Sequence, residues 1–113
     1  MDNMDFNMYQ HQAGSTAQYP KDGINGLLYT TLGLASEAGE VAGKVKKILR
    51  DERGVISEEK RQQLIDEVGD VLWYCAMVAY ELQINLGAIA VKNIDKLQDR
   101  QKRGMIQGSG DNR

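Results

Sequence analysis

Apolar residues recur along this chain at the spacing of a helix and not in the alternation of a strand. The stripe within residues 27–49 consists of Leu34, Val41, Val45 and Ile48. A second stripe, in a segment that ends near residue 83, consists of Leu64, Val68, Val71, Cys75, Val78 and Leu82. Shorter helical patterns cover residues 2–19 and residues 86–103, the latter with Ile89, Ile94 and Leu97 on its inner side. The chain therefore predicts an all-α fold of four helices.

Residues that disfavour a helix separate these four segments. Pro20 and the polar, glycine-containing residues 21–26 end the first segment, and Gly54 lies between the second and the third. Ser57, which is followed by two glutamates, is typical of a helix N-cap with acidic residues in the first turn. The glycine-rich residues 105–113 predict an irregular tail after a helical domain that comprises residues 1–104.

Two acidic pairs of identical spacing lie beside the two long stripes. Glu37 and Glu40 are three residues apart in the second segment, and Glu67 and Asp70 are three residues apart in the third. This spacing places both carboxylates of a pair on one side of the helix, at the rim of the apolar stripe. Carboxylates that two packed helices bring together repel one another unless a cation lies among them, and oxygen ligands suit Mg²⁺. The pairs predict a metal site, with a solvated helix face as the alternative.

Glycines accompany both acidic pairs. Gly39 and Gly43 lie beside the first pair, and Gly69 lies within the second. A glycine inside a helix costs up to about 1 kcal/mol relative to alanine. We therefore expect a close neighbour or a ligand at these positions.

Aromatic and basic residues follow the acidic pairs along the chain. Packing in a core or an interface is the default explanation for Trp73, whereas Tyr74 lies one turn after Asp70 and could reach a ligand near the metal. Lys96 and Arg100 are one turn apart. They are either surface charges that pair with nearby acids or a clamp for phosphate.

Composition narrows the classes of function. A helical chain of 113 residues is one domain and often shares its core with a partner subunit. A net charge of −2 provides no basic footprint for a nucleic-acid polymer, and no apolar run reaches the roughly 20 residues of a membrane span. The single histidine, His11, and the lack of a Glu-x-x-His motif argue against a di-iron bundle. The polar first residues do not resemble a signal peptide, and Cys75 has no disulfide partner, so we expect a cytoplasmic location.

Taken together, these segments resemble the all-α nucleoside triphosphate pyrophosphohydrolases, and the MazG-like branch most closely. Residues 32–41 and 66–73 are similar to the two metal-binding segments of that branch, and residues 93–100 are similar to its third segment. The similarity spans roughly residues 9–103. The resemblance implies a MazG-like four-helix bundle that is completed by oligomerisation, as a homodimer or a homotetramer.

The resemblance also implies a metal-dependent hydrolase. The enzyme would cleave a ribo- or deoxyribonucleoside triphosphate to the monophosphate and pyrophosphate, in nucleotide-pool control or house-cleaning. Mg²⁺, or Mn²⁺ in its place, would be held by the catalytic residues Glu37, Glu40, Glu67 and Asp70. The substrate would be bound by Tyr74, Asn93, Lys96 and Arg100, with Trp73 as a further candidate for the nucleoside pocket.

The sequence departs from the family pattern in three places. Ser36 stands where the family often has a glutamate, which leaves the general base at that corner open. Asp66 takes the corresponding place in the second segment, and Arg100 is followed by Gln101 and not by the usual Tyr-Pro. Two further hypotheses therefore stay open. One is a non-catalytic helical oligomer that binds a nucleotide or a protein partner, and the other is a pyrophosphohydrolase for another phosphorylated nucleotide, such as phosphoribosyl-ATP.

Overall fold

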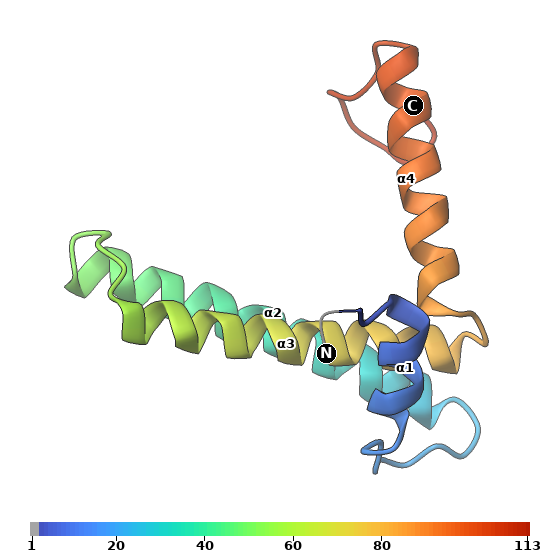
Figure 1. Cartoon of the computed structure of the whole chain (residues 1–113), viewed down its shortest axis with the longest axis horizontal. Helices are drawn as coiled ribbons and strands as arrows, with labels where there is room; N and C mark the ends of the chain where they lie inside the picture. The colour runs from blue at the N-terminus through green and yellow to red at the C-terminus, as the bar shows by residue number, and fades with distance from the viewer. Residues whose placement is uncertain (1–2) are drawn as a thin grey trace.

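The computed structural model describes residues 3–113, which contain four helices and no strand (Figure 1). The helices are α1 (Phe6–Gly14), α2 (Asn25–Asp51), α3 (Glu58–Glu81) and α4 (Leu86–Lys102). This result confirms the all-α class and the four predicted helices. The predicted ends of α2, α3 and α4 differ from the observed ends by at most two residues.

The start of α3 confirms the predicted N-cap. The Ser57 hydroxyl oxygen accepts a hydrogen bond from the backbone N–H of Lys60 at 3.2 Å. Glu58 and Glu59 occupy the first turn, where negative charge is favourable because the helix dipole is positive there. Each of these features is local in sequence, which is why the sequence alone could place this helix end.

The first helix is shorter than the sequence predicts. The prediction of a helix over residues 2–19 is wrong at both ends, since α1 begins at Phe6, after the extended N-cap Asp5, and stops at Gly14; Met1 and Asp2 lie outside the described residues. The hydroxyl groups of Ser15 and Thr16 donate to the carbonyl oxygens of Gln12 and Ala13, at 2.7 and 2.8 Å. In a continued helix these two carbonyl oxygens would accept from backbone N–H groups of the next turn, and here the side-chain hydroxyls compete for them. Gly14 also favours the end of the helix, because glycine has a low helix propensity.

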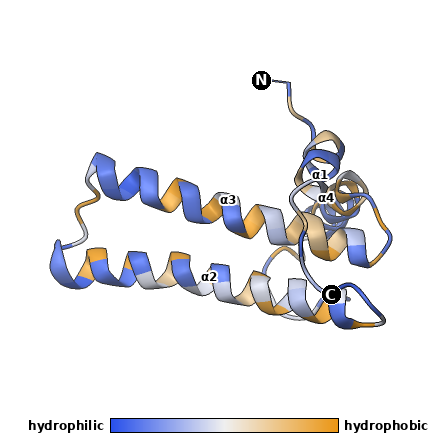
Figure 2. Cartoon of the chain, turned by 90° about the horizontal axis from the view of Figure 1, so that it is seen from below, coloured by the Kyte–Doolittle hydropathy of each residue, from blue (hydrophilic) through white to orange (hydrophobic). Residues whose placement is uncertain are grey.

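Helices α2 and α3 lie side by side in opposite directions, and α1 packs across the C-terminal part of α3 (Figures 1 and 2). Figure 2 shows that α3 is most hydrophilic at its start and becomes more hydrophobic toward α1. After α3, Gln83 adopts a left-handed φ of 59°, and α4 leaves at 100° to α3. Among residues 3–113, no single helix has the length and hydropathy to cross a membrane. Within this range, only α3 and α4 counted together, across the bend between them, meet both criteria.

The core lies where α1, α3 and the start of α4 meet. Its buried members are Ala13, Tyr19, Ala76, Met77, Ala79 and Leu86. Two amide side chains of α1 hold the first turn of α4 at this place. Gln10 Oε1 accepts from the Leu86 N–H, and Asn7 Oδ1 accepts from the Gly87 N–H, each at 2.9 Å. Because the first N–H groups of a helix have no partner within it, these bonds cap α4 and fix its start against α1.

The rest of α4 projects away from this core. Ile89, Ile94 and Leu97, which the sequence places on the inner side, are 37%, 50% and 39% exposed, because no other helix of residues 3–113 runs beside them. That expectation is wrong within one chain. The radius of gyration of 16.9 Å exceeds the roughly 13 Å of a compact chain of this length. The four helices do not close into a bundle within one chain, and completion by oligomerisation stays a prediction.

Candidate metal centre

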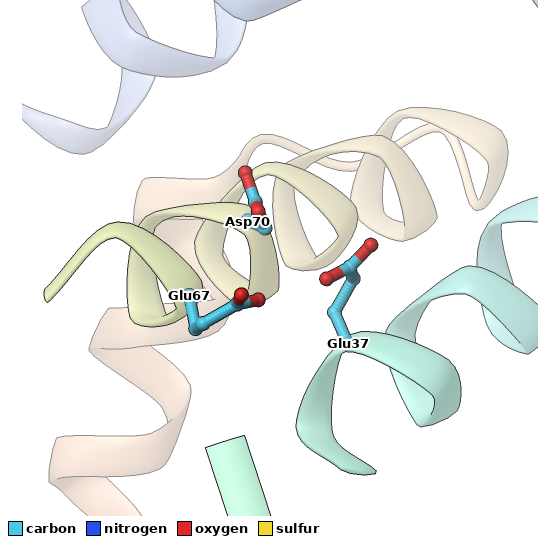
Figure 3. A group of neighbouring side chains, drawn as sticks. All are labelled: Glu37, Glu67 and Asp70. Atoms are coloured by element: carbon cyan, nitrogen blue, oxygen red, sulfur yellow. The ribbon is translucent and has the colours of Figure 1, made fainter. Parts of the chain in front are cut away.

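Three of the four predicted acidic ligands come together where α2 faces α3. Glu37 projects from α2 toward Glu67 and Asp70, which lie one turn apart on α3 (Figure 3). One carboxylate oxygen from each residue lies within 4.8 Å of the other two. The three-residue spacing on α3 directs Glu67 and Asp70 to the same side. A cation among these oxygens could therefore be bound by both helices at once.

The fourth predicted ligand, Glu40, lies outside this group of three. It is exposed and sits one turn beyond Glu37 on α2. Its charge is one of those that raise the pKa of Glu37. In this arrangement Glu40 acts on the cluster through its charge and not as a member of the closest set.

The acidic group is electrostatically strained. The pKa of Glu37 lies above its ordinary value, first because partial burial disfavours the charged form and then because Asp70, Glu67 and Glu40 repel that charge. The pKa of Tyr9 is raised chiefly by burial and next by Asp70. A divalent cation would relieve this repulsion. The donors are carboxylate oxygens only, which fit Mg²⁺ or Mn²⁺ better than a softer metal.

A lysine from α2 lies at the edge of the acidic group. Lys44 Nζ is 3.8 Å from Glu67 Oε1, and both side chains are partly buried. Lys44 is not among the residues that the sequence singled out for this site. Its spacing could have indicated the contact, since Lys44 lies one turn after Glu40 and two turns after Glu37. The cluster thus carries one cation of its own, which partly offsets the charge of Glu67.

A pocket of about 320 Å³ opens beside the acids and is lined by Glu37, Asp70, Trp73 and Tyr74. The two aromatic rings meet edge to face, with 4.9 Å between their centroids. Gly33 allows the Tyr74 ring to lie against α2, because a methyl group added to Gly33 would come within 2.6 Å of ring atom Cδ1 and closer to Cε1. The pocket therefore joins a carboxylate wall to an aromatic wall, so it can take a ligand that has a planar ring and a metal-bound group.

Further tyrosines extend the aromatic wall, and the sequence did not single them out. The Tyr19 and Tyr29 rings are stacked with 5.2 Å between centroids, and the centroid of Tyr29 is 6.4 Å from that of Tyr74. Tyr29, Gly33 and Glu37 are each four residues apart, so they share one face of α2. That spacing is the signal by which sequence reasoning could have found Tyr29.

The glycines singled out in the sequence lie in open space. No atom of residues 3–113 comes within 4 Å of a Cβ built on Gly39, Gly43 or Gly69, apart from their own helices and chain neighbours. The expectation of a close neighbour at these positions is wrong within one chain. Within α2, the close approaches occur at Gly33, against the Tyr74 ring, and at Gly26, against the Glu81 side chain.

The predicted substrate ligands of α4 lie away from the acids. Asn93, Lys96 and Arg100 belong to the projecting part of that helix (Figure 1). A rise of 1.5 Å per residue along two nearly perpendicular helices separates Arg100 from Asp70 by roughly 25 Å. Lys96 and Arg100 contact Asp111 of the tail instead. The structure thus brings three acids and Tyr74 together, and it does not bring the α4 residues to them within one chain.

A larger cavity of about 920 Å³ lies between α1 and the C-terminal end of α3. Its lining includes His11 and Lys21, with Glu81 facing them from α3. None of the predicted acidic ligands borders it. It is therefore separate from the group of Glu37, Glu67 and Asp70.

Comparison with known proteins gives two matches. The family described as the MazG nucleotide pyrophosphohydrolase domain matches residues 26–105. The Gene 37 protein of Mycobacterium phage L5 is 53% identical over 114 residues, which cover 97% of this chain and 100% of the phage protein. No solved structure matches the chain. The family match includes the acids, the aromatic pair and the α4 residues, and it begins after α1.

Proposed function

The chain belongs to the MazG nucleotide pyrophosphohydrolase family, and from this premise we propose that it hydrolyses nucleoside triphosphates to nucleoside monophosphates and pyrophosphate. The observation that carries the proposal is the meeting of Glu37, Glu67 and Asp70 beside an aromatic pocket. All of these residues lie within the region that matches the family. The role would be control or cleaning of the nucleotide pool, in the cytoplasm.

The four predicted acids would hold Mg²⁺, or Mn²⁺ in its place. Glu37, Glu67 and Asp70 would be direct ligands, and Glu40 would add a carboxylate from the next turn of α2. When bound, the metal supplies charge neutralisation for the triphosphate and activation of the attacking water. One carboxylate of the set would accept the proton of that water, and because the acids titrate as a coupled group the role belongs to the set.

The aromatic wall would bind the nucleoside. Stacking of a base on an aromatic ring is favourable and tolerant of base identity, at about 1–3 kcal/mol per base. Tyr74 borders the acids directly, and Trp73 is held in place because its Nε1–H donates to the Thr16 hydroxyl at 2.9 Å. A base stacked against this aromatic wall would set its phosphates over the carboxylates.

The phosphates would be contacted by Asn93, Lys96 and Arg100. Since these residues and the acids lie on two separate arms of one chain, a single site that contains both requires a second copy. A homodimer or homotetramer would supply it, and the exposed apolar residues of α4 support such an assembly. Assembly also agrees with the extended shape of the chain.

Pyrophosphate release from a panel of nucleoside triphosphates, with Mg²⁺ and with a chelator, tests the proposal. We expect metal-dependent release of monophosphate and pyrophosphate. Asp70→Asn should abolish it with the helical content unchanged, whereas Glu59→Gln, which removes an equal charge from the exposed first turn of α3, should not. Nucleotide binding without any hydrolysis would favour the non-catalytic oligomer. Activity restricted to phosphoribosyl-ATP would favour the related pyrophosphohydrolase.

A further inference from the structure

The tail after α4 folds back onto that helix. Its direction changes at Gly104, Gly108 and Gly110, whose φ angles of 69°, 122° and 85° lie in a region that favours glycine. Arg113 then donates to the carbonyl oxygens of Met105, Ile106 and Gly110, at 3.2, 2.8 and 2.6 Å. The tail that the sequence predicts as irregular is therefore a closed loop with its own hydrogen bonds.

This loop buries Arg100. The residue is only 4% exposed, although residues 91–99 of the same helix are all exposed. Its Nη2 donates to the backbone oxygen of Asp111 at 2.6 Å and lies 3.5 Å from the Asp111 carboxylate. Lys96 Nζ lies 3.3 Å from the same carboxylate oxygen. One carboxylate thus sits between the two cations.

The tail leaves hydrogen-bond donors of this cationic pair without good acceptors. Arg100 Nε is buried and has no hydrogen-bond partner among residues 3–113. The contacts of Nη2 with the Gly110 carbonyl and the Asp111 carboxylate are long, at 3.4 and 3.5 Å. A guanidinium group offers five N–H donors in a fork that matches the oxygens of a phosphate. A phosphate group would therefore bind this arginine better than the single carboxylate does.

We propose that Lys96 and Arg100 form an anion site that the chain's own Asp111 carboxylate occupies, so that the tail competes with the phosphates of a nucleotide. The Asp111 carboxylate stands in for a phosphate group. Its side chain is 86% exposed, so the contact is one that a ligand can displace. Lys96, and next Arg100, lower the pKa of Asp111, which therefore stays charged at neutral pH. The link to turnover rests on the proposed function, whereas the binding of phosphate does not.

Binding of inorganic pyrophosphate to the full chain, measured by titration calorimetry, tests the site directly. Asp111→Asn removes the two ion pairs by which the exposed Asp111 carboxylate holds Lys96 and Arg100. Since ion pairs with an exposed partner are weak, we expect this variant to bind pyrophosphate about five-fold more tightly. Asp95→Asn is the matched control, because it removes the same charge from the residue next to Lys96 and has no ion pair among residues 3–113. Its affinity should change less than about two-fold, as expected for an exposed, screened charge that makes no ion pair with the site.

Several outcomes would overturn the inference. The first is that Asp111→Asn binds pyrophosphate no more tightly than the wild-type chain. The second is that Asp111→Asn and Asp95→Asn gain the same affinity. The third is that neither the wild-type chain nor Asp111→Asn binds pyrophosphate. Arg100→Ala should abolish the binding while circular dichroism confirms the helical content.

Measurement of nucleotide hydrolysis distinguishes a failure of this inference from a failure of the proposed function. If nucleotides are hydrolysed, Asp111→Asn should lower KM with kcat unchanged, and an unchanged KM would refute the competition. If nothing is hydrolysed but the variant binds pyrophosphate more tightly, the proposed function fails and the anion site stands.

Discussion

Replacement of Gly33 by alanine should push the Tyr74 ring out of the acidic pocket, whereas the same replacement at Gly39 should stabilise the protein. Both glycines lie inside α2, so both gain the same helix propensity, about 1 kcal/mol. They differ in what the new methyl group meets. At Gly39 it meets open space, and at Gly33 it meets three atoms of the Tyr74 ring, of which the farthest is 2.6 Å away.

The size of the effect follows from that difference. Because the helix term is common to both variants, their difference in stability isolates the clash. An extra methyl group in a filled site costs about 1–3 kcal/mol. With an unfolding entropy of about 2.1 cal/mol/K per residue, 1 kcal/mol corresponds to roughly 4 °C for this chain. Gly39→Ala should therefore raise Tm by about 4 °C, and Gly33→Ala should melt roughly 4–12 °C below it.

Thermal unfolding of four variants provides the assay. The first pair, Gly33→Ala and Gly39→Ala, is compared with the wild type, and the second pair is compared with Tyr74→Ala alone. The second pair carries each glycine replacement in a Tyr74→Ala background, where no ring remains to clash. There Gly33→Ala should stabilise as much as Gly39→Ala does. If Gly33→Ala remains destabilising without the ring, the clash is not the cause and the reasoning is refuted. In the enzymatic assay Gly33→Ala should raise KM by at least about five-fold, since displacement of Tyr74 forfeits a stacking contact worth about 1–3 kcal/mol.

Three further predictions concern charge and capping. The pKa of Glu37 is raised in the folded chain, so its protonated form stabilises the fold fully below the unfolded pKa, near 4.5, and this stabilisation is lost as the pH rises through the higher folded pKa. In the presence of a chelator, Tm should therefore fall from acid to neutral pH more in the wild type than in Glu37→Gln. Addition of Mg²⁺ at neutral pH should raise the Tm of the wild type again. Gln10→Ala removes two donated and one accepted hydrogen bond and should cost about 2–3 kcal/mol in a denaturant titration, whereas Gln12→Ala on the same helix should cost little. Lys44→Met removes the cation beside Glu67 and should tighten Mg²⁺ binding about two- to five-fold by calorimetry, a result that weaker binding would contradict.

Features that depend on neighbours in sequence could be predicted. The Ser57 cap, the lengths of α2 and α3, and the shared face of Glu67 and Asp70 each follow from spacing along one helix. The early end of α1 shows the limit of this reasoning. There the Ser15 and Thr16 hydroxyls compete with backbone N–H groups for helical carbonyls, and the spacing of apolar residues gives no sign of that competition.

Features that depend on contacts between distant segments could not be predicted. The direction of α4 is one of them, because it follows from a left-handed φ at Gln83, which is not a glycine, and from caps supplied by Asn7 and Gln10. The role of each glycine is another. Helix propensity singled out Gly39 by its cost, but only the packed structure places the Tyr74 ring at Gly33.

The direction of α4 also decides how the candidate site must be built. If α4 lay along α2 and α3, one chain could place Lys96 and Arg100 over the acids, and the apolar residues of α4 would be covered. Instead the helix projects at 100°, its apolar side chains are exposed, and Lys96 and Arg100 hold a carboxylate of their own tail. The acids proposed to hold the metal and the cations proposed to bind phosphate are thus each grouped within one chain, but the two groups do not face each other. A second copy that covers α4 would bring together halves from different chains, so assembly and substrate binding would depend on the same helix.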